Sequence, residues 1–411
     1  MKYVFFYRRL SDIDHITPII YSLLCSGVDP KKILYTPLDI NKTTVNLKMD
    51  KRIIFLMNRN IVFKQSFFNK IYIIRNKITL LNDNINNKIA NKFFSLVIFL
   101  LHKLQTFYFF MRTLFIVLGC INRKIIITDD LIYNKLLKLS SFLKIITVVV
   151  PHGISLHNGE IKDKSYSLRH VLPNLLDEDF LYTHKIIYND FLFESKKLNF
   201  KNLKNLGSAR YCNEWTEVLK EIYPKIDSLF CNDKTNVLFL VEKSIIDRTI
   251  DGKIKNIVDS KKLNELIDFL SESDKYNIII KTHPSSQDSY LNFNSKKNVL
   301  VVDTDNFYST FQLTNFSNII FGFKSGSICD AILLNKYFVL LDYCVVHKLV
   351  AKKFIDKINF SVSYEDTKSK LSQYSSTTLG DNSRFISEYL GSKNLNTLKR
   401  YSSFLLSLKY K

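Results

Sequence analysis

The stretch Ile278-Ile-Ile-Lys-Thr-His-Pro-Ser-Ser286 joins a short apolar run to a loop of polar residues. Consecutive isoleucines are typical of a strand that is covered on both faces, as in a parallel sheet. Lys281, His283 and Ser285 follow the carboxyl end of this strand, and Pro284 restricts the backbone beside them. A lysine brings charge to a phosphate, and histidine and serine bring directed hydrogen bonds. The loop therefore predicts a phosphate site; a His-Pro turn with a satisfied histidine is the alternative.

A second strand followed by a polar loop lies within Asn318–Asn335. Here the apolar run is followed by Lys324, Ser325, Gly326 and Ser327, and then by a helical pattern. Free backbone N–H groups at a helix start, a small glycine, two hydroxyls and a lysine make an anion site. A plain N-cap by one of the two serines is the alternative. Both loops are expected at the carboxyl ends of strands in one sheet.

Short apolar runs rich in β-branched residues recur through both halves of the chain. The first half contains Tyr3–Tyr7, Lys32–Tyr35, Arg52–Met57, Ile71–Ile74, Lys124–Thr128, Ile145–Val150 and Lys185–Tyr188. The second half contains Asn236–Val241, Tyr276–Ile280, Asn298–Val302, Asn318–Phe323 and Tyr337–Leu341. Longer amphipathic stretches separate these runs, which indicates βαβ units. We predict an α/β fold of two doubly wound, Rossmann-like domains that face a cleft and bind ligands at the carboxyl ends of their strands.

Changes in composition suggest where these domains begin and end. The charged, Lys/Asn-rich passage from Ser195 to Asp233 is expected to be the linker region. We predict one domain over residues 1–225 and a second over residues 226–381. Residues 382–411 have a helical pattern, and this last helix can pack back on the first domain.

Length and composition exclude several classes of protein. A chain of 411 residues that is 46% hydrophobic can bury two cores, which excludes a disordered chain. The N-terminal apolar run turns charged at Arg8 and Arg9, too early for a signal peptide. Six cysteines without a C-x-x-C pair argue against a zinc ribbon or a secreted disulfide framework: Cys25, Cys120, Cys212, Cys231, Cys329 and Cys344. We expect buried thiols in a cytoplasmic protein.

The chain is strongly basic, with a formal net charge of +21. An AT-rich genome favours Lys, Asn and Ile codons and can produce this balance without functional pressure. The other explanation is attraction to polyanions, with an anionic membrane surface and nucleotide phosphates as the expected partners. Nucleic acid is not expected, because the sequence has no RNP, zinc-finger or basic-zipper signature.

The stretch Phe93–Ile121 is dense in Phe, Leu, Ile and Val. His102, Lys103, Gln105 and Arg112 interrupt it, and a charge at mid-helix costs about 2.5–3.5 kcal/mol on the insertion scale, which weakens a transmembrane interpretation. A pair of helices packed on the sheet is favoured. An interfacial helix with its aromatic face in the headgroup region is the third arrangement.

The first half of the chain offers candidates for acid–base chemistry. The strand in Val148-Val-Val-Pro-His-Gly153 ends at a turn that carries His152, which is expected to face the same cleft as the two phosphate loops. Asp12, Asp14 and His15 follow the first strand and precede a helix. Either aspartate can serve as the helix cap. Asp14, His15 and His152 are also candidates for a base that acts on a hydroxyl nucleophile.

Arg210 lies in the segment Gly207–Trp215, which contains the single tryptophan. It can reach a phosphate across the cleft or pair with Glu214. Three Asp-x-Asp pairs occur, and the last of them, Asp303/Asp305, follows an apolar strand and suits either a metal or a loop that lines the nucleotide base. No H-E-x-x-H, G-x-S-x-G, Walker A or G-x-G-x-x-G motif supports a zincin, serine hydrolase, P-loop enzyme or dehydrogenase.

The combination of Pro151-His-Gly153, Lys281-Thr-His-Pro284 and Gly322-Phe-Lys-Ser-Gly-Ser327 resembles a known group of enzymes. It is similar to the two-domain, GT-B-type bacterial glycosyltransferases of capsule and lipopolysaccharide assembly. A His-Pro motif followed by a Ser-containing loop is similar to the pattern in sialyl- and polysialyltransferases, and CDP-glycerol and Kdo transferases have comparable loops. The resemblance covers the order of elements over most of the chain, through short motifs.

The resemblance implies an acceptor-side first domain and a nucleotide-sugar-binding second domain. It implies a nucleotide-sugar donor, with CMP-sugars favoured over UDP- and GDP-sugars, and a surface polysaccharide or lipid-linked glycan as acceptor. No metal or other cofactor is expected, and the protein would act at the inner face of the plasma membrane. By the resemblance, His283 and Ser325 or Ser327 would contact the donor phosphate. The full set of donor-binding candidates is Lys281, His283, Pro284, Ser285, Lys324, Ser325, Gly326, Ser327 and Arg210.

The chain departs from these families in two places. Sialyltransferases carry an acidic motif for the catalytic base where this chain has Leu156-His-Asn-Gly159. CDP-glycerol transferases continue the His-Gly pair with Thr-Pro, where this chain has Ile154-Ser155. A polyol-phosphate transferase and a non-enzymatic polyanion-binding protein remain the alternatives. The base stays open among Asp12, Asp14, His15, His152 and Glu160.

Overall fold

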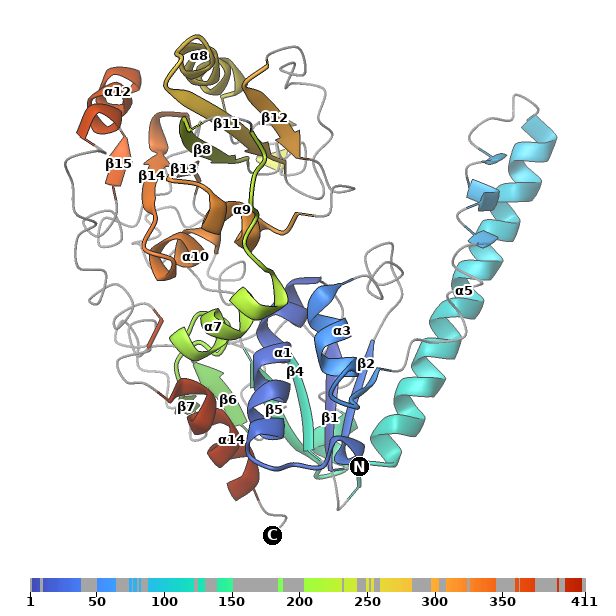
Figure 1. Ribbon diagram of the computed structural model, residues 1–411. Helices are drawn as coiled ribbons and strands as arrows, with labels where there is room; N and C mark the ends of the chain where they lie inside the picture. Colours follow the sequence, from blue (N-terminus) through green and yellow to red (C-terminus); the bar gives the residue numbers. More distant parts are fainter. Residues whose placement is uncertain are drawn as a thin grey trace. The chain divides into compact units, whose positions relative to one another are not determined.

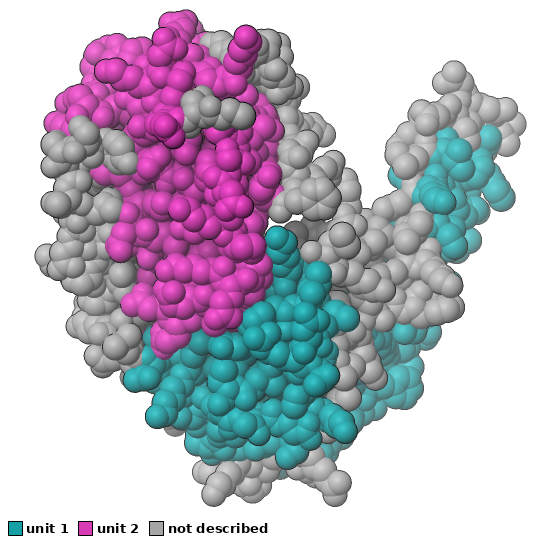
Figure 2. Space-filling view, viewed as in Figure 1, with its two compact units in different colours: residues 1–153, 172–210, 396–411 teal, residues 154–171, 211–395 magenta. Residues whose placement is uncertain are grey.

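The computed structural model divides into two compact α/β units, which Figure 2 distinguishes by colour. The first unit comprises Met1–Gly153, Leu172–Arg210 and Asn396–Lys411, and the second comprises Ile154–Val171 and Tyr211–Leu395. The division falls after Arg210, earlier than the boundary expected at residue 225. The structure describes residues 2–408 except 8–9, 38–49, 64–73, 76, 80, 83–87, 122–124, 130–138, 151–183, 188–202, 231–232, 242–248, 251–252, 255–258, 283–296, 303–307, 324–325, 345–358, 362, 374–389 and 392–395.

The first unit is built on a seven-stranded sheet in the order β3-β2-β1-β4-β5-β6-β7 (Figure 1). Neighbouring strands are parallel throughout. Strands β1, β2 and β5 are buried along their whole length, as a parallel sheet covered on both faces requires. The strands are β1 (Tyr3–Tyr7), β2 (Ile33–Pro37), β3 (Val62–Phe63), β4 (Ile125–Asp129), β5 (Ile146–Val150), β6 (His184–Ile187) and β7 (Leu203–Asn205).

The expected strand at Arg52–Met57 is wrong, because these residues belong to helix α3 (Lys51–Met57). Asp50 is the N-cap, and its side chain accepts a hydrogen bond from the backbone N–H of Arg52 at 2.9 Å. The buried residues of α3 lie three apart, at Ile53 and Leu56, which is helical spacing. The next strand after β2 is β3, which begins five residues after α3 ends. Of the expected strand Ile71–Ile74, only Ile74 is described, and it is helical.

The passage Ser195–Asp233, expected to be a linker, contains ordered elements of both units. Strand β7 adds an edge to the first sheet, and helix α7 (Asn213–Ile222) follows as part of the second unit. The charged residues of α7 lie on the opposite side from an apolar face, so the average composition hides the helix. Its buried residues are Trp215, Thr216, Val218, Leu219 and Ile222.

The C-terminal helix α14 (Thr397–Ser407) belongs to the first unit and packs against α1 (Leu10–Cys25). The Tyr401 hydroxyl donates a hydrogen bond of 2.7 Å to the carbonyl of Gly207, which has a left-handed φ of 77°. Phe404 meets the ring of His184 edge-on at 5.4 Å between centroids. These contacts attach the end of the chain to both α1 and the β6–β7 edge.

The second unit is built on a six-stranded parallel sheet in the order β12-β11-β8-β13-β14-β15. A separate antiparallel pair is formed by β9 (Thr249–Ile250) and β10 (Lys253–Ile254). The sheet strands are β8 (Thr235–Leu240), β11 (Tyr276–Lys281), β12 (Val299–Val302), β13 (Ile319–Gly322), β14 (Tyr337–Leu341) and β15 (Asn359–Ser361). The helices are α7, α8 (Ser260–Ser271), α9 (Thr310–Phe316), α10 (Ser327–Leu333) and α12 (Tyr364–Gln373), with 3₁₀ turn η3 (Asp342–Cys344).

Both faces of the second sheet are buried, because alternate residues of its strands enter two different apolar clusters. Leu238, Ile279 and Ile320 point into the cluster that also contains α10 residues. Phe239, Ile278 and Phe321 point into the cluster that also contains α8 residues. This arrangement explains the near-continuous apolar strands of the sequence and confirms the doubly wound α/β prediction.

Residues 93–118 belong to a single helix, α5 (Lys88–Leu118), and the favoured pair of sheet-packed helices is therefore wrong. Many of its large apolar side chains are exposed, including Phe107 and Phe115. Within the part of the chain that the structure describes, α5 alone is long and apolar enough to cross a bilayer, by length and composition. The remaining element of the first unit is the 3₁₀ turn η1 (Pro30–Lys32).

Candidate functional site

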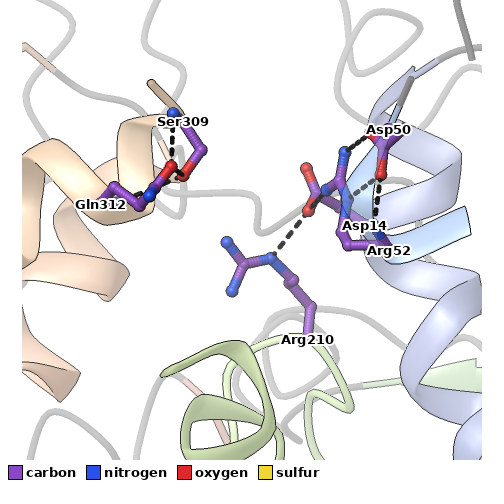
Figure 3. Close-up of polar contacts among 6 residues, drawn as sticks. All are labelled: Asp14, Asp50, Arg52, Arg210, Ser309 and Gln312. Atoms are coloured by element: carbon purple, nitrogen blue, oxygen red, sulfur yellow. Dashed lines mark hydrogen bonds and ion pairs between the residues drawn. The ribbon is translucent and has the colours of Figure 1, made fainter. Parts of the chain in front are cut away.

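A cluster of four charged side chains lies in the first unit: Asp14, Asp50, Arg52 and Arg210 (Figure 3). Arg52 donates from Nε to Asp50 Oδ1 at 2.9 Å and from Nη2 to Asp50 Oδ2 at 2.5 Å. Its Nη1 atom pairs with Asp14 Oδ1, and Arg210 Nε donates to the same oxygen at 3.2 Å. Asp14 thus joins two arginines that are distant in sequence.

The cluster lies where the strands of the first sheet end. Asp14 is on α1, the helix that follows β1, and Arg52 is on α3, the helix that follows β2. Arg210 follows β7 in the chain. Because these strands are parallel, their carboxyl ends meet at one edge of the sheet, which is where α/β sheets bind ligands.

The charges of this cluster are balanced and largely shielded from water. The side chains of Arg52 and Arg210 are 11% and 7% exposed, and that of Asp14 is 33% exposed. Burial opposes ionisation of Asp14, but the nearby charges of Arg52, Arg210 and His15 outweigh it and hold the pKa of the Asp14 carboxyl below its usual value. A carboxylate with a lowered pKa is a weak base at neutral pH.

The other first-half candidates are only partly described. Asp12 and His15 are buried residues of α1, and the charge of His15 acts on Asp14. His152 and Glu160 lie outside the described residues. Arg210 is bonded to Asp14, a partner that the sequence did not suggest.

Asp50 and Arg52 are the two members of the cluster that the sequence did not single out. Arg52 lay inside a run interpreted as a strand, where its side chain had no assigned role. The signal that identifies it is Asp50, an N-cap residue directly before an apolar run. An aspartate in that position begins a helix, and it also brings its carboxylate within reach of the arginine two residues on.

In the second unit, the two predicted phosphate loops leave the sheet at the same level. Lys281, the last residue of β11, pairs in register with Leu240 of β8, and Gly322, the last residue of β13, pairs with Leu240 from the other side. With about 4.8 Å between neighbouring strands, the two strand ends lie roughly 10 Å apart. The segments from Thr282 and Phe323 onward therefore start from one edge, on either side of β8.

The start of the second loop is tightly packed. Gly326 is the N-cap of α10, so neither serine of the loop is the N-cap. A methyl group added at Gly326 would lie 2.4 Å from the hydroxyl oxygen of Tyr211 and 3.5 Å from its ring carbon Cζ. The backbone of the loop thus approaches the Tyr211 hydroxyl at a distance that only glycine allows.

The start of the first loop holds a buried hydroxyl. Thr282 is 2% exposed, and its Oγ1 atom has no hydrogen-bond partner among the residues that the structure describes. Its backbone N–H donates to the carbonyl of Val302 at 3.2 Å, which fixes the residue against β12. A buried hydroxyl without a partner costs stability.

Helix α9 begins differently from α10. The Ser309 hydroxyl accepts from the backbone N–H of Gln312 at 3.1 Å, and the Gln312 side chain accepts from the Ser309 N–H at 3.2 Å (Figure 3). This capping box uses the donors at the start of α9 internally. The Gln312 amide also donates to the carbonyl of Pro224 at 3.2 Å, tying α9 to the end of α7.

Several predicted residues cannot be placed. The donor-site candidates His283, Pro284, Ser285, Lys324 and Ser325 lie outside the described residues, as do Asp303 and Asp305. Among the residues that are described, no three His, Cys, Asp or Glu side chains gather closely enough to hold a metal ion. Metal independence stays a prediction.

The described cysteines only partly match the expectation of buried thiols. Cys120, Cys212, Cys329 and Cys344 are buried, whereas Cys25, the last residue of α1, is exposed. Cys231 lies outside the described residues.

Two Rossmann-like units, each with a parallel sheet and polar residues at its carboxyl edge, define a GT-B-type fold. Solved structures of this kind are similar over nearly the whole chain. A UDP-GlcNAc 2-epimerase from Methanocaldococcus jannaschii, in complex with UDP-GlcNAc and UDP, is 13% identical with a TM-score of 0.54, over 99% of each chain. The epimerase from Neisseria meningitidis bound to UDP-GlcNAc is 11% identical with a TM-score of 0.51, over 99% of this chain and 98% of that one.

A third similar structure belongs to a different enzyme. The wall teichoic acid polymerase TagF, with CDPG, is 11% identical with a TM-score of 0.53, over 98% of this chain and 88% of that one. No family model and no curated protein sequence matches the chain. These likenesses confirm the predicted fold class.

Proposed function

We propose that the protein is a metal-independent glycosyltransferase that moves a sugar from a nucleotide-activated donor to a surface polysaccharide or lipid-linked glycan. CMP-sugars are favoured as donors over UDP- and GDP-sugars, following the His-Pro motif. In this proposal the protein acts at the cytoplasmic face of the plasma membrane. The observation that carries it is the common level at which the loops after β11 and β13 leave the second sheet.

Those loops have the chemistry that a nucleotide phosphate requires. Their first residues, Lys281–Gln287 and Gly322–Cys329, contain two lysines, a histidine and several hydroxyls, and an aspartate follows each stretch, at Asp288 and Asp330. Thr282 adds a buried hydroxyl that a ligand oxygen would satisfy. As the glycosidic bond breaks, negative charge grows on the leaving nucleotide, and fixed donors aimed at it lower the barrier. In this proposal His283, Ser325 and Ser327 are those donors.

The acceptor hydroxyl needs a base from the first unit. Asp14 is disfavoured for this role because its ion pairs lower its pKa, and it acts instead as a positioning residue for Arg52 and Arg210. His15 and His152 remain as candidate bases, since the usual pKa of histidine lies near neutral pH.

A polyol-phosphate transferase is the second candidate. The likeness to TagF with CDPG favours it, because the same loops would bind the phosphates of a CDP-linked polyol. In that reaction the phosphate stays with the transferred group. Phosphorus analysis of the product therefore separates the two reactions.

Two variants in the first loop test the proposal, one by its transfer rate and the other by its nucleotide binding. His283→Ala should lower the transfer rate by about 10²–10³ while the protein stays folded. Thr282→Val replaces a hydroxyl by a methyl of similar volume, so it should leave stability unchanged or raised and still weaken binding of CMP, CDP or UDP. Binding is measured by thermal shift, where a ligand at about 100 times its Kd adds about 2.7 kcal/mol.

Two matched controls accompany these variants. Thr314→Val removes another fully buried hydroxyl without a partner in the structure, in α9 of the same unit, and should leave nucleotide binding unchanged. His102→Ala removes an exposed histidine of the first unit. Equal nucleotide binding by Thr282→Val and wild type, together with normal transfer by His283→Ala, would refute the proposal.

The same assays identify the alternatives. Conversion of UDP-GlcNAc without any acceptor would indicate an epimerase in place of a transferase. Indifferent binding of many polyanions, with a steep dependence on salt, would indicate a polyanion-binding protein.

A further inference from the structure

Helix α5 is amphipathic in the opposite sense from a helix on a protein surface. Some of its polar side chains bind other parts of the first unit. Arg112 donates to the carbonyl of Pro37 at 3.1 Å and pairs with the Thr36 hydroxyl. Further toward the N-terminus, Gln105 accepts a hydrogen bond of 2.8 Å from Arg75 and is buried.

Nine of the described large apolar side chains of α5 are exposed, whereas Val117, near its C-terminal end, is buried in the core of the first unit. Six of the exposed side chains occur at intervals of three, four, four, three and eight along the helix, which places these six on one side. Phe93, Phe107 and Phe115 are 61%, 62% and 66% exposed. We call this the α5 stripe: Phe93, Leu96, Leu100, Leu104, Phe107 and Phe115. Exposed apolar surface of this length marks an interaction site.

The charge around the stripe identifies the partner. The sequence contains no Asp or Glu between Asp83 and Asp129. Lys92 and Lys103 are exposed, and the Lys103 ammonium group lies 5.2 Å from the ring centre of Phe99 on the same helix. Exposed apolar side chains with exposed lysines beside them suit a surface of anionic headgroups above hydrocarbon.

The hydrogen bonds on the polar side of α5 distinguish a helix that lies on a bilayer from one that crosses it. Hydrogen bonds to other parts of the first unit occur from Ser95, which bonds to Asn82, through Gln105 to Arg112. At 1.5 Å per residue this span is about 26 Å, close to the roughly 30 Å thickness of the hydrocarbon core. A crossing helix would carry Arg75 and Arg112 into hydrocarbon, whereas a helix in the membrane plane keeps that side on the protein.

We propose that the α5 stripe inserts into the interfacial region of an anionic lipid bilayer, with the helix axis in the membrane plane. This inference deepens the membrane association included in the proposed function, and it names the element that makes the contact. It does not depend on the reaction, because neither donor nor acceptor takes part in the contact.

Co-sedimentation of the full-length protein with vesicles tests the insertion. Vesicles of phosphatidylglycerol mixed with phosphatidylcholine should bind the protein, and phosphatidylcholine alone should bind it more weakly. Phe107→Ser with Phe115→Ser should weaken binding to the mixed vesicles by about tenfold or more. The matched control is Phe142→Ser, which removes a phenylalanine that is 83% exposed outside α5. Equal binding by the double variant and the control would overturn the proposal.

A fluorescence measurement separates the orientations. The only native tryptophan, Trp215, is fully buried, so a tryptophan introduced on α5 can be followed against it. With lipids brominated at different depths, Phe93→Trp, Leu104→Trp and Phe115→Trp should be quenched at one shallow depth. Deepest quenching at position 104 alone would mean a spanning helix and would overturn the proposal.

Light scattering without vesicles tests whether a second copy of the chain, and not lipid, covers the α5 stripe. A dimer that the double variant converts to a monomer would overturn the lipid assignment. A state of association that the double variant leaves unchanged supports it. Failure of vesicle binding with normal nucleotide binding would remove this inference and leave the transferase proposal standing.

Discussion

The charged cluster of the first unit and the two predicted phosphate loops of the second differ in how their charges are arranged. In the first unit, two arginines meet two aspartates, and the ion pairs of Arg52 hold the start of α3 against α1. In the second unit, the loops after β11 and β13 begin with basic residues, whereas Asp303 and Asp305 follow β12 of the same sheet in the sequence. We call the four-residue cluster the balanced edge and the start of these two loops the basic edge. Paired charges stabilise the fold from within, whereas a group of basic residues gains most from an anion that comes from outside.

The largest effect is expected from breaking the balanced edge. Arg52→Ala leaves Asp50 and Asp14 without their shared partner. Loss of one member of a fully buried ion pair costs about 3–5 kcal/mol. Because this cluster is only partly shielded from water, the free energy of unfolding should fall by about 2 kcal/mol. Calorimetry measures the loss. Lys51→Ala, at the exposed neighbouring position of α3, is the control and should change stability by less than about 0.5 kcal/mol. Equal effects of the two substitutions would show that the cluster contributes nothing.

A smaller effect is expected from crowding the basic edge. Gly326→Ala places a methyl group 2.4 Å from the Tyr211 hydroxyl oxygen, and overpacking of this kind costs about 1–3 kcal/mol. Tyr211→Phe removes that oxygen and leaves the ring carbon at an ordinary 3.5 Å. Thermal unfolding of the two single variants and the double variant should therefore show that Tyr211→Phe relieves much of the cost. Additive losses in the double variant would contradict the close approach.

The smallest effect under ordinary conditions is the pH dependence of the balanced edge. The pKa of Asp14 is held below its usual value in the folded protein, so the unfolded chain binds more protons as the pH falls. The stabilisation is complete above the unfolded pKa of about 3.9 and is lost below it, toward the folded pKa. Asp14→Asn should make the decline of the melting temperature below about pH 4 less steep. An unchanged decline would show that Asp14 does not contribute to acid sensitivity.

The loops of the second unit could largely be predicted from the sequence, whereas the charged cluster of the first unit could not. In the second unit, the predicted phosphate loops follow β11 and β13, which lie where the apolar runs placed them, and β14 occupies the expected residues Tyr337–Leu341. In the first unit, Arg52 was assigned to a strand because five apolar residues follow it without interruption. The N-cap at Asp50 and the burial of Ile53 and Leu56, three residues apart, distinguish the helix. Short apolar runs leave this choice open until their neighbours are known.

The sequence by itself determined the α/β class, the two series of parallel strands and the apolar character of residues 93–118, because these depend on local periodicity and composition. The tertiary structure alone decided that Asp14 joins Arg52 to Arg210 and that Phe107 and Phe115 of α5 are exposed. It also decided that the strands leading to the two predicted phosphate loops end on either side of β8. The reason is that pairing across long stretches of chain, and the side of a helix that the protein covers, depend on which surfaces meet after folding.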